Sequence, residues 1–177
     1  MSNSVASTAL RHSLQLRTLT PADVGGVLHI QTLCYGADFA ESEAVFTRRL
    51  QAAHHCSWAA QQGGQLVAYL AAYWSGHGKV TPLEGDFAAL PQASVLYLHD
   101  MAVNPAQAGQ GVARKLLQVA LDQASARGVR QAALVAVQGA DRYWARQGFV
   151  PDPLQDGQQQ AHLRSYGEDA VYMVRHW

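Results

Sequence analysis

The most constraining feature of this chain is a strand, a glycine loop and a helix in direct succession over residues 95–128. A largely apolar run ends at Val103, and the loop that follows it contains Gly109 and Gly111. From there, apolar residues recur at spacings of three and four and fall on one helical face up to Gly128. This succession favours a domain that mixes strands with helices.

The beginning of that predicted helix is a candidate anion site. The first backbone N–H groups of a helix have no internal partner, and the macrodipole adds about half a positive charge there. Gly109 and Gly111 have no Cβ, so a phosphate can approach these amides closely. A Walker A loop would need Gly-Lys-Ser/Thr, for which Lys115 is misplaced, and a dinucleotide fingerprint would need a glycine where Arg114 stands. A glycine turn without a ligand remains the alternative.

Shorter patterns predict the other elements. We expect strands over 14–18, 57–61, 66–74, 131–137 and 170–175, and helices over 20–34, 42–50 and 141–147. Gly63-Gly64 should turn a β-hairpin, and residues 75–94 should form a long loop. This order predicts a mixed α/β fold in a single domain over 14–177, after a disordered lead over 1–13.

The amino-acid composition limits the classes of molecule that the chain is expected to bind. Thirteen acidic and thirteen basic residues give a formal net charge of zero, which provides no electrostatic case for a nucleic acid or an anionic membrane. The N-terminal residues lack the apolar core of a secretory signal, which favours a cytoplasmic location. Cys34 and Cys56 make neither a disulfide framework nor a metal-ligand spacing, so we expect no metal site. A homodimer is compatible with these observations.

Two motifs resemble the GCN5-related N-acetyltransferase (GNAT) family. Residues 108–113, Ala-Gly-Gln-Gly-Val-Ala, are similar to the family pattern Gln/Arg-x-x-Gly-x-Gly/Ala, with Ala108 in place of Arg or Gln. Residues 139–149 are similar to the family's short helix that ends in Tyr-x-x-x-Gly-Phe. The resemblance implies a twisted, mostly antiparallel sheet of six to seven strands, splayed between 95–103 and 131–137, with about four helices around it.

The resemblance also implies acetyl-CoA as the acyl donor. The pantetheine arm would lie in the splay beside residues 101–103, and the pyrophosphate would bind the amides of 109–114. The residues expected at the coenzyme are Met101, Ala102, Val103, Ala108, Gly109, Gln110, Gly111, Val112, Ala113, Arg114 and Trp144.

Acyl transfer needs a base for the amine and an acid for the leaving thiolate. By the resemblance, His99 stands where the family often carries a Glu, and histidine suits a base or a proton relay near neutral pH. Tyr97 lies two residues earlier on the same strand face and would help to position the amine, whereas Asp100 should point away. Trp144 replaces the family's usual acid. Three alternatives follow for the leaving thiolate: the neighbouring Tyr143 donates the proton, water donates it, or the thiolate leaves without being protonated.

The predicted activity is the acetylation of a primary amine, with a small molecule as the favoured acceptor. One alternative is the acetylation of a protein N-terminus or lysine. Another is an acyl-CoA sensor with little turnover, an interpretation that Trp144 and Ala108 allow because both depart from the family pattern. A pocket closed by the 75–94 loop would favour a small molecule, and an exposed groove would favour a peptide.

Overall fold

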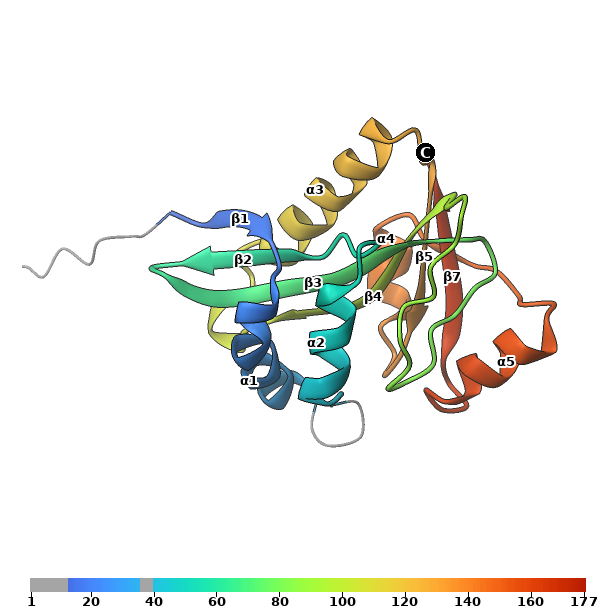
Figure 1. Ribbon diagram of the computed structural model, residues 1–177, viewed down its shortest axis with the longest axis horizontal. Helices are drawn as coiled ribbons and strands as arrows, with labels where there is room; N and C mark the ends of the chain where they lie inside the picture. Colours follow the sequence, from blue (N-terminus) through green and yellow to red (C-terminus); the bar gives the residue numbers. More distant parts are fainter. Residues whose placement is uncertain (1–12, 36–39) are drawn as a thin grey trace, which may run out of the picture.

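The computed structural model describes residues 13–35 and 40–177. The lead expected over 1–13 lies outside these residues except for Ser13, and the assignment of 14–177 to a single domain stays a prediction. A strongly twisted sheet forms the centre of the molecule and carries helices on both faces (Figure 1). Within the described ranges, no helix is long and apolar enough to cross a membrane.

Among the described residues the sheet has seven strands, in which the neighbours β4 and β5 run parallel and the other neighbours antiparallel. In spatial order the strands are β1 (Gln15–Thr18), β2 (Trp58–Gln62), β3 (Gln65–Ser75), β4 (Val95–Val103), β5 (Gln131–Ala136), β7 (Val171–His176) and β6 (Val150–Pro151). The mostly antiparallel sheet expected from the resemblance is therefore confirmed.

Within residues 13–35 and 40–177, five helices accompany the sheet, where about four were expected. They are α1 (Val24–Cys34), α2 (Glu43–Gln51), α3 (Val112–Ala126), α4 (Asp141–Arg146) and α5 (Gly157–Arg164), with 3-10 turns at Pro21–Asp23 and Pro105–Gln107. The predicted strands, helices and hairpin are all present, and Ser42 caps α2 by accepting a hydrogen bond from the Val45 N–H. The additional helix α5 and the short strand β6 were not predicted.

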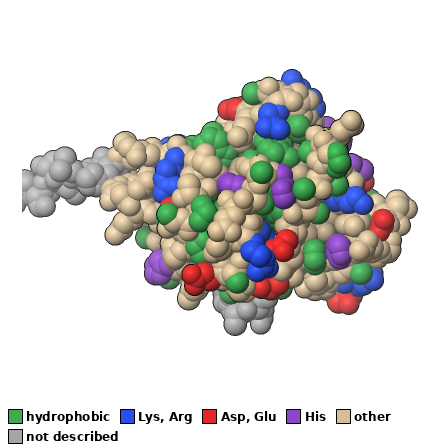
Figure 2. Space-filling model, in the orientation of Figure 1, with side chains coloured by type: hydrophobic (Ala, Val, Ile, Leu, Met, Phe, Trp, Pro, Cys, Tyr) green, Lys and Arg blue, Asp and Glu red, His purple; other side chains and the backbone are tan. Residues whose placement is uncertain are grey.

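Each face of the sheet has its own hydrophobic core. On one face α3 packs its apolar side, which includes Leu116, Leu117 and Ala120, against the sheet. On the other face α1 and α2 contribute Ile30 and Phe46 to a second core. Figure 2 shows acidic and basic side chains interspersed on the visible surface around these layers, in keeping with the zero net charge.

The sheet opens between β4 and β5. Their pairing covers only Leu96–Leu98 against Ala132–Leu134, although β4 continues to Val103 beside β3. The Asn104 N–H bonds the Val67 carbonyl, and bonded pairs alternate along an antiparallel ladder. The backbone groups of Met101 and Val103 therefore turn away from β3, toward the opening.

Candidate active site

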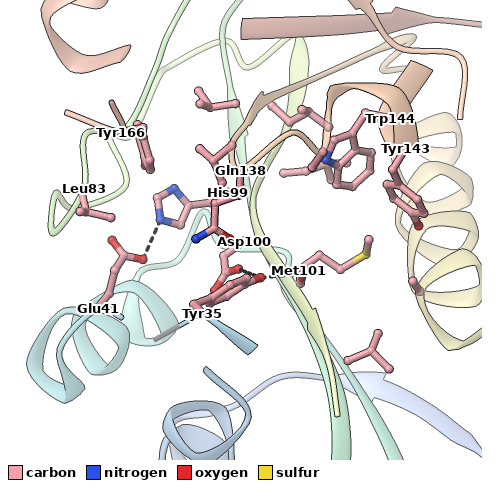
Figure 3. Close-up of a pocket in the computed structure, with 17 residues that line it drawn as sticks. Tyr35, Glu41, Leu83, His99, Asp100, Met101, Gln138, Tyr143, Trp144 and Tyr166 are labelled. Carbon is pink, nitrogen blue, oxygen red and sulfur yellow. Dashed lines mark hydrogen bonds and ion pairs between the residues drawn. The ribbon is translucent and has the colours of Figure 1, made fainter. Parts of the chain in front are cut away.

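A cavity of about 350 Å³ occupies the opening between β4 and β5 (Figure 3). It extends from the start of α2 on one side to α4 on the other, and the beginning of α3 touches it. Its walls are formed by Tyr35, Glu41, Leu83, Leu98, His99, Asp100, Met101, Val103, Ala113, Leu134, Val135, Val137, Gln138, Ala140, Tyr143, Trp144 and Tyr166. Within the described ranges, no group of three or more His, Cys, Asp or Glu side chains could hold a metal ion.

The loop before α3 has the geometry expected of an anion cradle. Gly109 and Gly111 adopt φ values of 75° and 73°, in the left-handed region that favours glycine, and Gly111 is the N-cap of α3. The stretch 108–111 is exposed, but the N–H groups of Ala108 and Gln110 already bond the carbonyls of Pro105 and Gln107. The N–H groups of Gly109 and Gly111 are therefore the candidates for binding an anion in this loop. Val112 is instead buried in the core, and Arg114 lies on the exposed side of α3, outside the cavity.

The three residues expected along the coenzyme arm do not all face the cavity. Met101 and Val103 line it, whereas the Ala102 side chain is buried in the core beneath α1 and α2. The Met101 carbonyl accepts a hydrogen bond of 2.9 Å from the Tyr35 hydroxyl, and the Val103 carbonyl accepts one from the Cys34 thiol. The end of α1 therefore holds the splayed end of β4 through these two carbonyls, on the side of the opening, and leaves the N–H groups of Met101 and Val103 for a ligand.

Tyr143 and Trp144 both line the cavity, on the side opposite His99 and Glu41 (Figure 3). The Trp144 ring packs edge-on against Tyr143 and Phe149, which anchors α4 to the α3 side of the sheet. Burial raises the pKa of the Tyr143 phenol, and the charge of Arg146 opposes this only partly. Tyr143 therefore stays protonated at neutral pH and can donate a proton to an acceptor in the cavity.

A β-bulge changes the direction of the side chains at the centre of β4. Ala71 of β3 pairs with Asp100, but Ala72 pairs with Leu98, so that His99 is an extra residue on β4. Because a bulge interrupts the alternation of side chains, His99 and Asp100 both point to the α1 and α2 face. The expectation that Asp100 points away from His99 is therefore wrong.

His99 belongs to a buried cluster with Glu41 and Arg49 that was not predicted. Arg49 donates two hydrogen bonds to the Glu41 carboxylate, of 2.6 and 2.7 Å, and His99 Nε2 lies 2.9 Å from Glu41 Oε2. The side chains of Arg49, Glu41 and His99 are only 1%, 3% and 2% exposed. Burial by itself raises the pKa of Glu41, but the His99 and Arg49 contacts outweigh it and hold that pKa well below its usual range.

Within the part of the chain that the structure describes, the second nitrogen of His99 has no hydrogen-bond partner. Nδ1 is buried, and no hydrogen bond to it is found among the residues that the structure describes. Buried polar atoms are nearly always hydrogen-bonded, so an orphan of this kind calls for an explanation. Since His99 lines the cavity, a molecule bound there can supply the missing partner.

Asp100 is held by two tyrosines instead of a cation. Its carboxylate accepts hydrogen bonds from the hydroxyls of Tyr35, at 2.7 Å, and of Tyr69. Burial raises the pKa of Asp100, although these two hydrogen bonds act in the opposite direction. The contacts give Asp100 the role of orienting neighbouring side chains, and it keeps Tyr35 against the cavity wall.

Tyr97, expected to help position the amine, lies in the core and does not line the cavity. It is 1% exposed, and its ring packs at 5.2 Å from that of Tyr73 and 6.3 Å from that of His99. Its contacts support the floor beneath His99, and they leave it out of reach of a molecule in the cavity.

Residues 76–94, here called the strap, cover the same side of the cavity as Glu41 and His99. The strap has no helix or strand, and Leu83 at its tip lines the cavity. The strap is hydrogen-bonded to α2 and its N-cap through Glu84 with Ser42 and Gly85 with Arg49. It is also hydrogen-bonded to α5 and the turn after it through Val80 with Gln159 and Thr81 with Tyr166. The strap is thus fastened at both sides, and it contributes Leu83 to this wall of the cavity.

Comparisons with known proteins agree with this geometry. The acetyltransferase (GNAT) family profile matches residues 26–149. The N-alpha-acetyltransferase RimI of Mycobacterium tuberculosis is 30% identical over 115 residues, which cover 65% of this chain and 65% of that protein. The chain spans only 28% of another curated mycobacterial relative.

Solved structures share the fold. The ribosomal-protein-S18-alanine N-acetyltransferase of Escherichia coli superposes with a TM-score of 0.68 at 21% identity, over 93% of this chain and 94% of that one. A GNAT family acetyltransferase of Brucella melitensis, solved with acetyl-CoA, gives a TM-score of 0.57 at 23% identity over 82% and 94%. With a profile match over most of its length, the chain belongs to the GNAT family of acetyltransferases.

Proposed function

We propose that the protein transfers the acetyl group of acetyl-CoA to a primary amine of a small molecule. The observation that carries the proposal is one continuous cavity, which joins the opening between β4 and β5 to the side chain of His99, whose Nδ1 has no hydrogen-bond partner among the described residues. The pantetheine arm would lie along Met101 and Val103, and its pyrophosphate would bind the amides at Gly109 and Gly111. The acetyl-CoA complex of the Brucella relative supports this donor.

In the proposed reaction the amine nitrogen attacks the thioester carbonyl carbon, and the C–S bond breaks after a C–N bond has formed. The proton that the amine loses goes to His99 Nδ1. The coenzyme leaves as a thiolate, which takes a proton from Tyr143 on the opposite wall or from water. Because His99 and Tyr143 lie on opposite sides of the cavity, the two proton transfers would use separate groups (Figure 3).

The strap favours a small acceptor. It is fastened to both α2 and α5, and Leu83 and Tyr166 narrow the acceptor side of the cavity. Both carboxylates on this side already have partners, since Glu41 bonds Arg49 and Asp100 bonds two tyrosine hydroxyls. An acceptor that is uncharged apart from its reacting amine therefore fits better than one with a second cationic group.

A protein N-terminal amine is the second candidate acceptor, and the 30% identity to RimI favours it. The two can be separated by following thiol release from acetyl-CoA with a panel of small primary amines and with short peptides that differ at their first residue. The proposal predicts release with small amines at lower concentrations than with any peptide. Preference for peptides would support the second candidate, and tight acetyl-CoA binding without release would support a sensor.

A further inference from the structure

Glu41 and His99 lie on the side of the cavity opposite Tyr143 and Trp144 (Figure 3), and Arg49 pairs with Glu41 from outside the cavity lining. We propose that Glu41 and Arg49 are positioning residues, which hold His99 in the tautomer that presents an unprotonated Nδ1 to the amine acceptor. The inference rests on the proposed acetyl transfer and adds a role for two residues that do not themselves touch the reacting atoms.

The donors around Glu41 determine which nitrogen of His99 carries the proton. The Glu41 carboxylate accepts from both terminal nitrogens of Arg49 and from the backbone N–H of Glu84, at 2.6 to 2.9 Å. An ionised carboxylate can only accept, so the remaining contact at 2.9 Å requires a proton on His99 Nε2. In a neutral imidazole the lone pair then lies on Nδ1.

Arg49 is needed because a buried carboxylate is otherwise driven to take up a proton. A protonated Glu41 could donate to His99 Nε2, and the imidazole proton would then move to Nδ1 and block it. Arg49 prevents this by its paired hydrogen bonds to Glu41. Arg49 is itself fixed by the Gly85 carbonyl and by the rings of Phe46 and Phe87, so the pair is rigid.

The charges of the cluster also suit proton uptake at Nδ1. Arg49 and Glu41 together are neutral, and when His99 gains a proton the nearest charge is the Glu41 carboxylate. The titratable groups that face His99 from the surrounding elements are Glu41, Arg49, Tyr97, Asp100 and Tyr166. Among these, only Glu41 makes a hydrogen bond to the imidazole within the described ranges.

A purely structural cluster would leave Nδ1 either bonded or outside the cavity. Here the cluster fixes Nε2, while Nδ1 has no hydrogen-bond partner among the described residues and belongs to a side chain that lines the cavity. This division of the two nitrogens, one held and one available, is the arrangement by which a carboxylate orients a histidine base in acyl transfer.

The test combines three variants of the full chain. Glu41→Gln replaces the acceptor by an amide that can donate to Nε2, and Glu41→Gln with Arg49→Met removes both charges together, which protects folding. The matched control is Asp23→Asn with Arg17→Met, because Arg17 and Asp23 form a similar paired contact outside the cavity lining. Readouts are the tautomer of His99 by nitrogen NMR, the pH profile of kcat/KM and the Kd for acetyl-CoA.

We expect wild-type His99 to carry its neutral-form proton on Nε2, and both Glu41 variants to shift protonation toward Nδ1. Their kcat/KM should fall by about a hundredfold or more with a changed pH profile, while the Kd for acetyl-CoA stays within about twofold. The control variant should keep the wild-type kcat/KM and the wild-type Kd for acetyl-CoA. A folded Glu41 and Arg49 double variant with unchanged kcat/KM and pH profile would overturn the inference, as would a wild-type proton on Nδ1. The wild-type tautomer can be read even if no amine is acetylated, an outcome that would instead refute the proposed function.

Discussion

Replacing Arg49 by Met should destabilise the protein more than any surface substitution. Arg49 is 1% exposed, and its loss would leave the Glu41 carboxylate buried with only His99 and the Glu84 N–H as partners. Removing one member of a buried ion pair typically costs about 3–5 kcal/mol. The whole domain is expected to be stable by only about 5–15 kcal/mol, so this loss is a large fraction of the total.

The magnitude can be measured by urea unfolding and by thermal melting at pH 7. For a domain of this size, a loss of about 3–5 kcal/mol lowers Tm by about 6–20 °C. The double variant with Glu41→Gln removes the orphaned charge, so it should recover much of the stability that Arg49→Met loses. An Arg49→Met variant within about 1 kcal/mol of wild type would refute the reasoning, since it would mean that the buried carboxylate needs no cation.

The same variants should differ in their response to pH. In the wild type the folded-state pKa of Glu41 lies below its unfolded value, so its stabilising contribution is complete above that unfolded value and is lost as pH falls. Without Arg49, burial should raise the pKa of Glu41 instead. The stability deficit of Arg49→Met should therefore shrink as the pH is lowered toward about 5, because protonation neutralises the carboxylate.

Three further predictions concern other residues of the site. Gly111→Ala places a Cβ at φ 73°, which should cost about 1 kcal/mol in unfolding experiments and weaken acetyl-CoA binding in calorimetry; an unchanged Kd would contradict the proposed anion cradle. Asp100→Asn should be at least as stable as wild type at pH 7, because the raised pKa of Asp100 makes its ionisation costlier in the folded state; this advantage should vanish below about pH 4, where the unfolded chain is protonated too. Tyr143→Phe should keep the Kd for acetyl-CoA but slow thiol release by about tenfold or more, and an unaltered rate would assign the proton to water.

The strand, loop and helix over 95–128 were predictable because each step has a local cause. The left-handed conformations at Gly109 and Gly111 need glycine, and the apolar face of α3 repeats with the helical period. α5 has no such signal: its sequence is polar and buries only Gln159, and tertiary hydrogen bonds hold it in place. The available cue was Asp156, whose carboxylate caps the helix.

The acceptor side of the site could be predicted only in part. His99 was identified from its place on the strand, but the bulge that turns Asp100 to the same face depends on pairing with β3. Glu41 lies 58 residues away in sequence and comes beside His99 only in the folded chain. Arg49 did carry a signal, because a charged residue among the buried apolar positions of α2 implies a buried partner.

At the opening between β4 and β5, the donor and the acceptor would be recognised by different kinds of protein group. The proposed donor would be recognised largely by main-chain groups at Met101, Val103 and the glycine loop, and these persist through most substitutions of side chains. The acceptor would meet side chains from the strap, α5 and the start of α2, which mutation changes one at a time. A scaffold divided in this way can exchange one substrate for another while it retains the same donor, so its acceptor specificity is free to diverge among descendants of a single ancestor.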